Sequence, residues 1–162
     1  MKTILLALLP ALTGLPSSAL PSSHPFVVRA SSAADDLVRA LDAEGVPEGP
    51  ERLTWARRAF VWAYFESAYQ TDALGDGGKS CGVMQVTKTG LDLLKGATCE
   101  SVRKDRVQGF RVGLRTMKVL IDKCGSVEAG LGAYATNGEC KKGVTIGLVM
   151  RRMKLAGEWG KP

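Results

Sequence analysis

The sequence contains a single histidine, His24, which lies in a stretch rich in proline and serine at residues 20–29. This composition is typical of a linker, so we expect residues 20–31 to lead into a fold. Serine and cysteine nucleophiles usually need a histidine base held beside them. The position of His24 therefore argues against both of these classes of hydrolase.

The sequence also lacks an apolar run that could span a bilayer. The apolar run at residues 4–15 is short and is interrupted by Pro10. Lys2 precedes it, and the small residues Ser17, Ser18 and Ala19 follow it. This pattern is typical of a secretory signal, the alternative being an uncleaved N-terminal anchor. We predict a signal peptide over 1–19, a secreted or periplasmic protein of the cell envelope, and no stable membrane span after cleavage.

Closely spaced cysteine pairs are absent, which argues against a zinc site with four cysteine ligands. The four cysteines Cys81, Cys99, Cys124 and Cys140 all follow the predicted signal. An even number in an exported chain indicates two disulfides, for which three pairings exist. We favour Cys81–Cys99 with Cys124–Cys140 because each closes a short loop, and Cys81–Cys140 with Cys99–Cys124 stays open. We expect no metal and no cofactor.

No block of lysine and arginine interleaved with aromatic residues occurs, although the formal net charge is +6. Nucleic acid is therefore not the expected partner, least of all in an exported protein. A diffuse positive charge suits an anionic extracellular polymer. The alternative is that the charge only keeps the surface soluble.

A phosphate-binding loop is missing too. Residues 75–82 include four glycines and the run Gly78-Lys79-Ser80, but not at the spacing that such a loop requires. So many glycines predict a turn-rich loop, and residues 83–86 (VMQV) after it predict a short strand.

Helical periodicity accounts for most of the remaining sequence. We predict helices over 32–43, 50–66, 91–95, 107–124, 127–134 and 143–156. Gly125 is placed to end one of these helices, and Ser126 to cap the next. The prediction is a mainly α domain over 32–162, with a central buried helix and one small β element beside the glycine-rich loop.

The central helix ends in a carboxylic acid. Residues 59–65 (AFVWAYF) are apolar on every side, and Glu66 follows them. Burial and the negative end of a helix dipole both favour the neutral acid, which can donate a proton to a leaving oxygen. Alternatively, Glu66 forms a structural ion pair with Arg57, Arg58 or Lys79.

The residues around Glu66 favour the catalytic interpretation. Glu66-Ser67, followed after a loop by Gly82-Val83-Met84-Gln85, resembles the Glu-Ser…Gly-Leu-Met-Gln signature of the lytic transglycosylase and goose-type lysozyme superfamily. Residues 106–120, with Gly109, resemble the long helix of that superfamily, and Ala133-Tyr134 resembles the start of its Ala-Tyr-Asn motif. The resemblance covers residues 53–137.

The resemblance implies a lysozyme-like fold that cleaves peptidoglycan at the β-1,4 bond between N-acetylmuramic acid and N-acetylglucosamine. Glu66 would be the general acid and base, and Ser67 would help to fix the site. Met84 and Gln85 would form the cleft wall, and the Tyr134 hydroxyl would point toward Glu66. For Met84 and Tyr134 the alternative is packing in the core. We expect peptidoglycan strands as the partner and a monomer.

The sequence departs from the motif at two places. Asn137 stands three residues after Tyr134, where it either takes the role of the motif's asparagine in binding substrate or forms a turn. Asp76 is a candidate second catalytic carboxylate or a turn residue, and Thr87 stands where goose-type lysozymes often carry aspartate.

The reaction type depends on Asp76. If Asp76 holds a water, direct hydrolysis with inversion follows, with the two carboxyl groups about 6.5–9.5 Å apart. If it does not, Glu66 acts alone in a lytic transglycosylase reaction, which we favour because only one carboxylate is secure. Two alternatives remain: a non-catalytic peptidoglycan-binding or structural protein of the same fold, and an extracellular binding module for some other partner.

Overall fold

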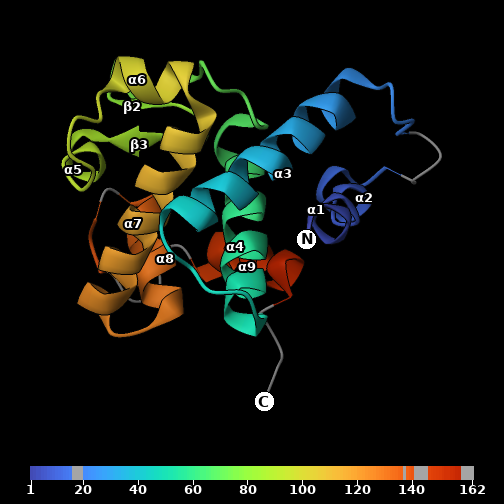
Figure 1. Cartoon of the computed structure of the whole chain (residues 1–162). Helices are drawn as coiled ribbons and strands as arrows, with labels where there is room; N and C mark the ends of the chain where they lie inside the picture. Colours follow the sequence, from blue (N-terminus) through green and yellow to red (C-terminus); the bar gives the residue numbers. More distant parts are fainter. Residues whose placement is uncertain (16–19, 137, 141–145, 158–162) are drawn as a thin grey trace.

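The computed structural model describes residues 1–15, 20–136, 138–140 and 146–157. The chain is mainly helical, with a small three-stranded antiparallel sheet, which confirms the predicted class (Figure 1). The elements are α1 (Lys2–Leu6), α2 (Leu9–Thr13), α3 (Pro25–Ala43), α4 (Pro50–Ser67), β1 (Leu74–Gly75), the 3-10 turn η2 (Asp76–Gly78), β2 (Ser80–Cys81), β3 (Val86–Thr87), α5 (Lys88–Leu91), α6 (Cys99–Lys104), α7 (Arg106–Cys124), α8 (Val127–Ala135) and α9 (Ile146–Ala156).

Helix α4 occupies the middle of the molecule (Figure 1) and packs against α3, α7 and α9. Residues 60–63 of this helix are completely buried, as the apolar sequence predicts. Pro50 begins the helix, where its missing N–H costs no hydrogen bond. The helix ends where Ala68 and Tyr69 take positive φ angles of 49° and 65°. Glu66 therefore lies in the last turn of a buried helix.

Helices α7 and α8 form an antiparallel pair beside α4. Phe110, Leu114 and Met117 of the predicted apolar stripe are buried. Gly125 ends α7 with a φ angle of 75°, and the Ser126 hydroxyl accepts a hydrogen bond of 3.1 Å from the Ala129 N–H. Both end signals in the sequence are thus confirmed, and they fix where α8 begins.

Helix α3 begins earlier than predicted. Pro25 occupies its first turn, and Nδ1 of His24 accepts a hydrogen bond of 3.2 Å from the Phe26 N–H. A proline in the first turn and a capping side chain before it are favourable at a helix start. The structure therefore places residues 25–31 in this helix rather than in a linker.

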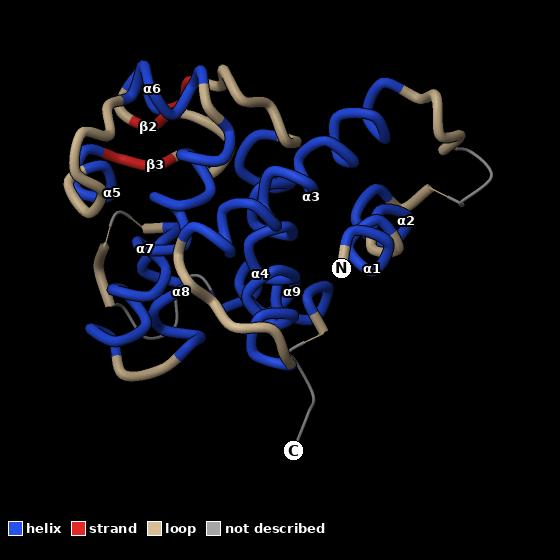
Figure 2. Tube along the Cα trace, viewed as in Figure 1, coloured by secondary structure: helices blue, strands red, loops and turns tan. Residues whose placement is uncertain are grey.

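The sheet lies at the edge of the molecule beside α5 and α6 (Figure 2). Strand β2 pairs with β1 and β3, with Cys81 opposite Leu74 on one side and Val86 on the other. The strand predicted over 83–86 is wrong except for Val86. Gly82 and Gln85 have positive φ angles of 75° and 47°, so the segment between β2 and β3 is a turn. The short helix predicted over 91–95 forms instead at Lys88–Leu91.

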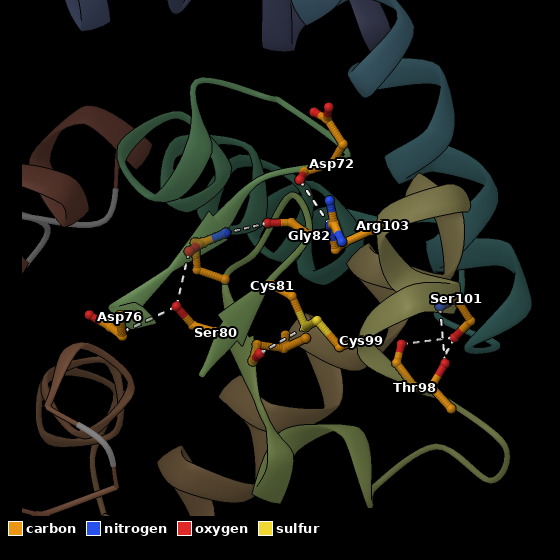
Figure 3. The surroundings of a disulfide bond; sticks show 11 residues. Asp72, Asp76, Ser80, Cys81, Gly82, Thr98, Cys99, Ser101 and Arg103 are labelled. Atoms are coloured by element: carbon orange, nitrogen blue, oxygen red, sulfur yellow. Dashed lines mark hydrogen bonds between the residues drawn. A yellow bond between two sulfur atoms is a disulfide. The ribbon is translucent and has the colours of Figure 1, made fainter. Parts of the chain in front are cut away.

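The two cysteine pairs are Cys81–Cys99 and Cys124–Cys140, with Cα–Cα distances of 5.7 and 5.4 Å. The favoured pairing is confirmed. Cys81–Cys99 joins β2 to the first residue of α6 (Figure 3). Two disulfides are compatible with an exported protein.

Helices α1 and α2 precede the predicted cleavage position. Leu5, Leu9 and Leu12 are buried, and α1 packs against α3. Lys2 forms an ion pair of 2.5 Å with Asp35 of α3. Whether residues 1–19 are cleaved stays a prediction. Across the described residues, none of the helices combines the length and the apolar content that a membrane crossing needs.

Candidate functional site

Glu66 is paired with an arginine from the other end of the chain. Its Oε1 accepts a hydrogen bond of 2.6 Å from Nη1 of Arg152, which lies on α9. The side chain of Glu66 is 19% exposed and that of Arg152 is 7% exposed. An ion pair does form, as the structural alternative required, but with Arg152 and not with Arg57, Arg58 or Lys79.

Aromatic rings hold Arg152 in place. Its guanidinium carbon lies 5.0 Å from the ring centre of Trp62 and 4.9 Å from that of Phe65. Both rings come from the last turns of α4, next to Glu66. A guanidinium against aromatic faces is attracted by their electrons, and this contact partly offsets the cost of removing the charge from water.

Ser67 ties the glycine-rich segment to the end of α4. Its hydroxyl is buried and lies 2.9 Å from the carbonyl oxygen of Val83 and 3.2 Å from that of Ala63. The Val83 contact joins α4 to the turn between β2 and β3. The hydroxyl is thus used inside the protein, so Ser67 positions its neighbours.

Asp76, Ser80 and Gln85 form a chain of polar contacts, and Figure 3 shows the contact between Asp76 and Ser80. The Ser80 hydroxyl lies 3.1 Å from Oδ2 of Asp76 and 3.0 Å from Oε1 of Gln85. The Gln85 amide donates a hydrogen bond of 2.9 Å to the Gly82 carbonyl oxygen. Asp76 is exposed, with a φ angle of 51°. These contacts fix the Gln85 side chain and give Asp76 a partner within its own loop.

Tyr134 and Met84 meet through the backbone. The Tyr134 hydroxyl donates a hydrogen bond of 2.7 Å to the Met84 carbonyl oxygen. Burial raises the pKa of Tyr134 well above its usual value, the carboxylate of Glu66 raises it further, and Arg152 lowers it. The phenol therefore keeps its proton, and its hydroxyl is directed at the Met84 carbonyl. That it points toward Glu66 stays a prediction.

The Met84 side chain is completely buried and points toward Gly113 of α7, where an added Cβ would come within 2.6 Å of its Cγ. The structure places Met84 in the core and not in a cleft wall. Gly113 has no side chain, so α7 lies close enough for Met84 to pack against it.

Glu66 lies between two of three neighbouring hollows. The central hollow, of about 230 Å³, is lined by Glu66, Asp76, Gln85, Tyr134 and Arg152, with Gly75, Ser80, Thr87 and Ala135. The outer hollow, of about 640 Å³, shares Glu66, Gly75 and Gln85 with it. The apolar hollow, of about 240 Å³ between α5, α7 and α8, shares Gln85, Thr87 and Tyr134.

The shared residues place the three hollows in a row, with the central one in the middle. Gln85 lines all three. The structure brings Glu66, Asp76, Gln85 and Tyr134 together around the central hollow, whereas Asn137 lies outside the described residues. Such a row of hollows suits an extended ligand, with the carboxylate of Glu66 near its middle.

Arg152 is the site residue that sequence reasoning missed. It lies in the basic run Arg151-Arg152-Met153-Lys154, which reads as the polar face of a terminal helix. Nothing in that run points to a partner 86 residues away. Ser80 and Thr87 were also missed as lining residues. In the part of the chain that the structure describes, no group of three or more His, Cys, Asp or Glu side chains is placed to hold a metal ion.

Comparisons with protein-family models, with curated proteins and with solved structures give no match.

Proposed function

We propose that the protein is a glycosidase that cleaves peptidoglycan at the β-1,4 bond between N-acetylmuramic acid and N-acetylglucosamine. The observation that carries the proposal is the position of Glu66 between the central and outer hollows, at the end of a buried helix. A long polymer can lie along the row of hollows with one bond beside Glu66. The motif resemblance supplies the substrate class.

In the proposed reaction Glu66 acts first as an acid. It gives its proton to the glycosidic oxygen, the bond from that oxygen to the anomeric carbon breaks, and the electron pair leaves with the oxygen. The resulting carboxylate of Glu66 then takes a proton from the 6-hydroxyl of the muramic residue. That oxygen bonds to the anomeric carbon and gives a 1,6-anhydro product.

The surrounding residues supply fixed polar contacts for this step. The Gln85 amide is held by Ser80 and Gly82, so little conformational freedom is lost when it binds a sugar. The Tyr134 phenol is held against the Met84 carbonyl and keeps its proton, which prevents a second negative charge beside Glu66. We include a lysozyme-like fold in this proposal.

Asp76 decides between two routes within the proposal. It lines the central hollow together with Glu66, which would allow it to hold a water for direct hydrolysis. Its contact with Ser80 is that of a loop residue, and we favour the transglycosylase route. Mass spectrometry of a wall digest separates the routes, because the transglycosylase product is lighter than the hydrolysis product by one water.

The ion pair between Glu66 and Arg152 favours a second candidate function. The hydrogen bond from Arg152 engages the carboxylate of Glu66 within the protein, where it does not contact a substrate oxygen. A non-catalytic protein that binds peptidoglycan strands in the same row of hollows would keep such an ion pair permanently.

Substitution Glu66→Gln separates the two candidates. For a catalytic acid we expect the clearing of purified cell walls to fall at least about 100-fold. The amide still accepts a hydrogen bond from Arg152, and near-ultraviolet circular dichroism checks that the variant is folded. Glu128→Gln, at an exposed position in the first turn of α8, is the matched control and should clear walls normally. Equal clearing by the wild type and Glu66→Gln, or no clearing by the wild type, contradicts the proposal.

A further inference from the structure

An arginine at position 152 is energetically unfavourable, because its charged side chain is removed from water. Its side chain is 7% exposed, and its Nε lies buried without a hydrogen-bond partner among the described residues. A buried ion pair of this kind is often no more stabilising than apolar residues of similar volume. The position is therefore poorly explained by stability alone, and a role in ligand binding is the natural alternative.

The pair is also placed where a ligand reaches both partners. Glu66 and Arg152 line the central hollow, and their contact is a hydrogen bond between Nη1 and Oε1. A guanidinium carries five N–H donors in a fork that matches a carboxylate. A second carboxylate that enters the central hollow can therefore compete with Glu66 for Arg152.

Such a competitor exists in the proposed substrate. N-acetylmuramic acid carries a lactyl ether whose carboxylate is free when no peptide is attached and is an amide when a peptide is attached. This group lies on the sugar that contributes the scissile bond. Bare glycan strands thus present a negative charge within reach of the acid, whereas strands with peptides present a neutral amide at the same place.

We propose that Arg152 is a specificity-determining residue that binds the free lactyl carboxylate and thereby releases Glu66 for catalysis. The inference rests on the proposed function. In the free protein Arg152 neutralises Glu66; in the complex it neutralises the substrate. Glu66 is then no longer hydrogen-bonded to the guanidinium, and it takes from solvent the proton that it delivers to the glycosidic oxygen. The acid step described above follows with the same transfer of atoms and electrons.

The test uses two substrates that differ in one group. Glycan strands are freed of peptide with an amidase, and half of the sample has its lactyl carboxylate converted to the methylamide. We expect the wild type to cleave the free carboxylate form with a kcat/KM at least about tenfold higher, the size of a charged hydrogen bond. Arg152→Gln should reduce this preference to less than about twofold. Arg151→Gln, the exposed neighbour on α9, should keep the preference and serves as the matched control.

A binding measurement guards against misfolding of the Arg152 variants. In Glu66→Gln no carboxylate competes for Arg152, so the free carboxylate glycan should bind this variant more tightly than it binds the wild type. The methylamide glycan should show no such gain. Equal cleavage of the two substrates by the wild type, or a preference that survives Arg152→Gln, overturns the role of Arg152 only. A wild type that cleaves neither overturns the proposed function itself.

Discussion

A buried and a half-buried tyrosine, Tyr69 and Tyr134, have different hydrogen-bonding environments in this fold. The Tyr134 hydroxyl has a carbonyl partner at 2.7 Å. The hydroxyl of Tyr69, which stacks on Phe60 with a ring-centre distance of 4.7 Å, has no hydrogen-bond partner among the described residues. Loss of a satisfied hydroxyl costs free energy, whereas loss of an unsatisfied one removes a cost of burial.

Matched Tyr→Phe substitutions should therefore change stability in opposite directions. We expect Tyr134→Phe to lower the free energy of unfolding by about 1–2 kcal/mol, since the Met84 carbonyl loses its donor. Tyr69→Phe should leave it unchanged or raise it by up to about 1 kcal/mol. Urea denaturation measures both. A larger loss in Tyr69→Phe would show that this hydroxyl has a partner.

Both tyrosines also predict a loss of stability at alkaline pH. The pKa of Tyr69 is raised above 10.0 by burial and then by Tyr64, and that of Tyr134 by burial and then by Glu66. Above about pH 10 the unfolded chain releases these protons while the folded chain keeps them. The contribution of these two tyrosines to the free energy of unfolding should be fully present below that pH and should fall as the pH rises above it. The double variant Tyr69→Phe/Tyr134→Phe should show a flatter pH profile.

The packing of the helices against one another decides which residues of the candidate site lie close together. Helix α8 brings Tyr134 to the central hollow because α8 approaches α7 very closely at Gly130. A Cβ at Gly130 would lie 2.4 Å from the Ile121 Cα, so a larger residue forces the helices apart. Gly113 has a similar role where α7 covers Met84. Small residues at these crossings thus set the geometry of the site.

Substitution Gly130→Ala should lower the free energy of unfolding by at least about 2 kcal/mol, even though alanine is the better helix former by about 1 kcal/mol. The clash involves backbone atoms that cannot rotate away. Gly109→Ala is the matched control, because its nearest contact is 3.1 Å, to the side chain of Val83, and its loss should be smaller. Urea denaturation of the two variants gives the comparison. A stabilised Gly130→Ala would contradict the close crossing.

At the scale of the molecule, the net charge and the disulfides both fit the proposed export of the protein. The chain carries a formal net charge of +6 and two disulfides, each expected to contribute about 3 kcal/mol to stability. If the protein is exported and acts on cell walls as we propose, its positive charge adds a long-range attraction to anionic wall polymers without any specific contact.

The binding of the protein to purified cell walls should therefore weaken with salt. We expect the apparent Kd to rise at least about tenfold between about 0.05 and about 0.5 M sodium chloride, since the Debye length shrinks from more than 10 Å to a few ångströms. The melting temperature, measured in the same buffers, should change little. An affinity that does not depend on salt would show that the charge serves solubility alone.

Most of the features that were predicted correctly depend on short stretches of sequence. Patterns that extend over about one helix length predicted helix α7, the start of α8 capped by Ser126, and the disulfide partners. The start of α3 at Pro25 was missed because a Pro/Ser composition hid a good helix start. Met84 was misplaced because its burial depends on the close approach of α7 at Gly113, a contact between segments far apart in the sequence.

The sequence by itself determined a mainly helical, disulfide-paired chain with a carboxylate at the end of its most apolar helix, because periodicity, caps and cysteine spacing act locally. Only the tertiary structure decided what that carboxylate faces. Arg152 reaches Glu66 across 86 residues. That contact depends on how α9 packs against α4, which is set by the shapes of all the helices between them and by no local pattern.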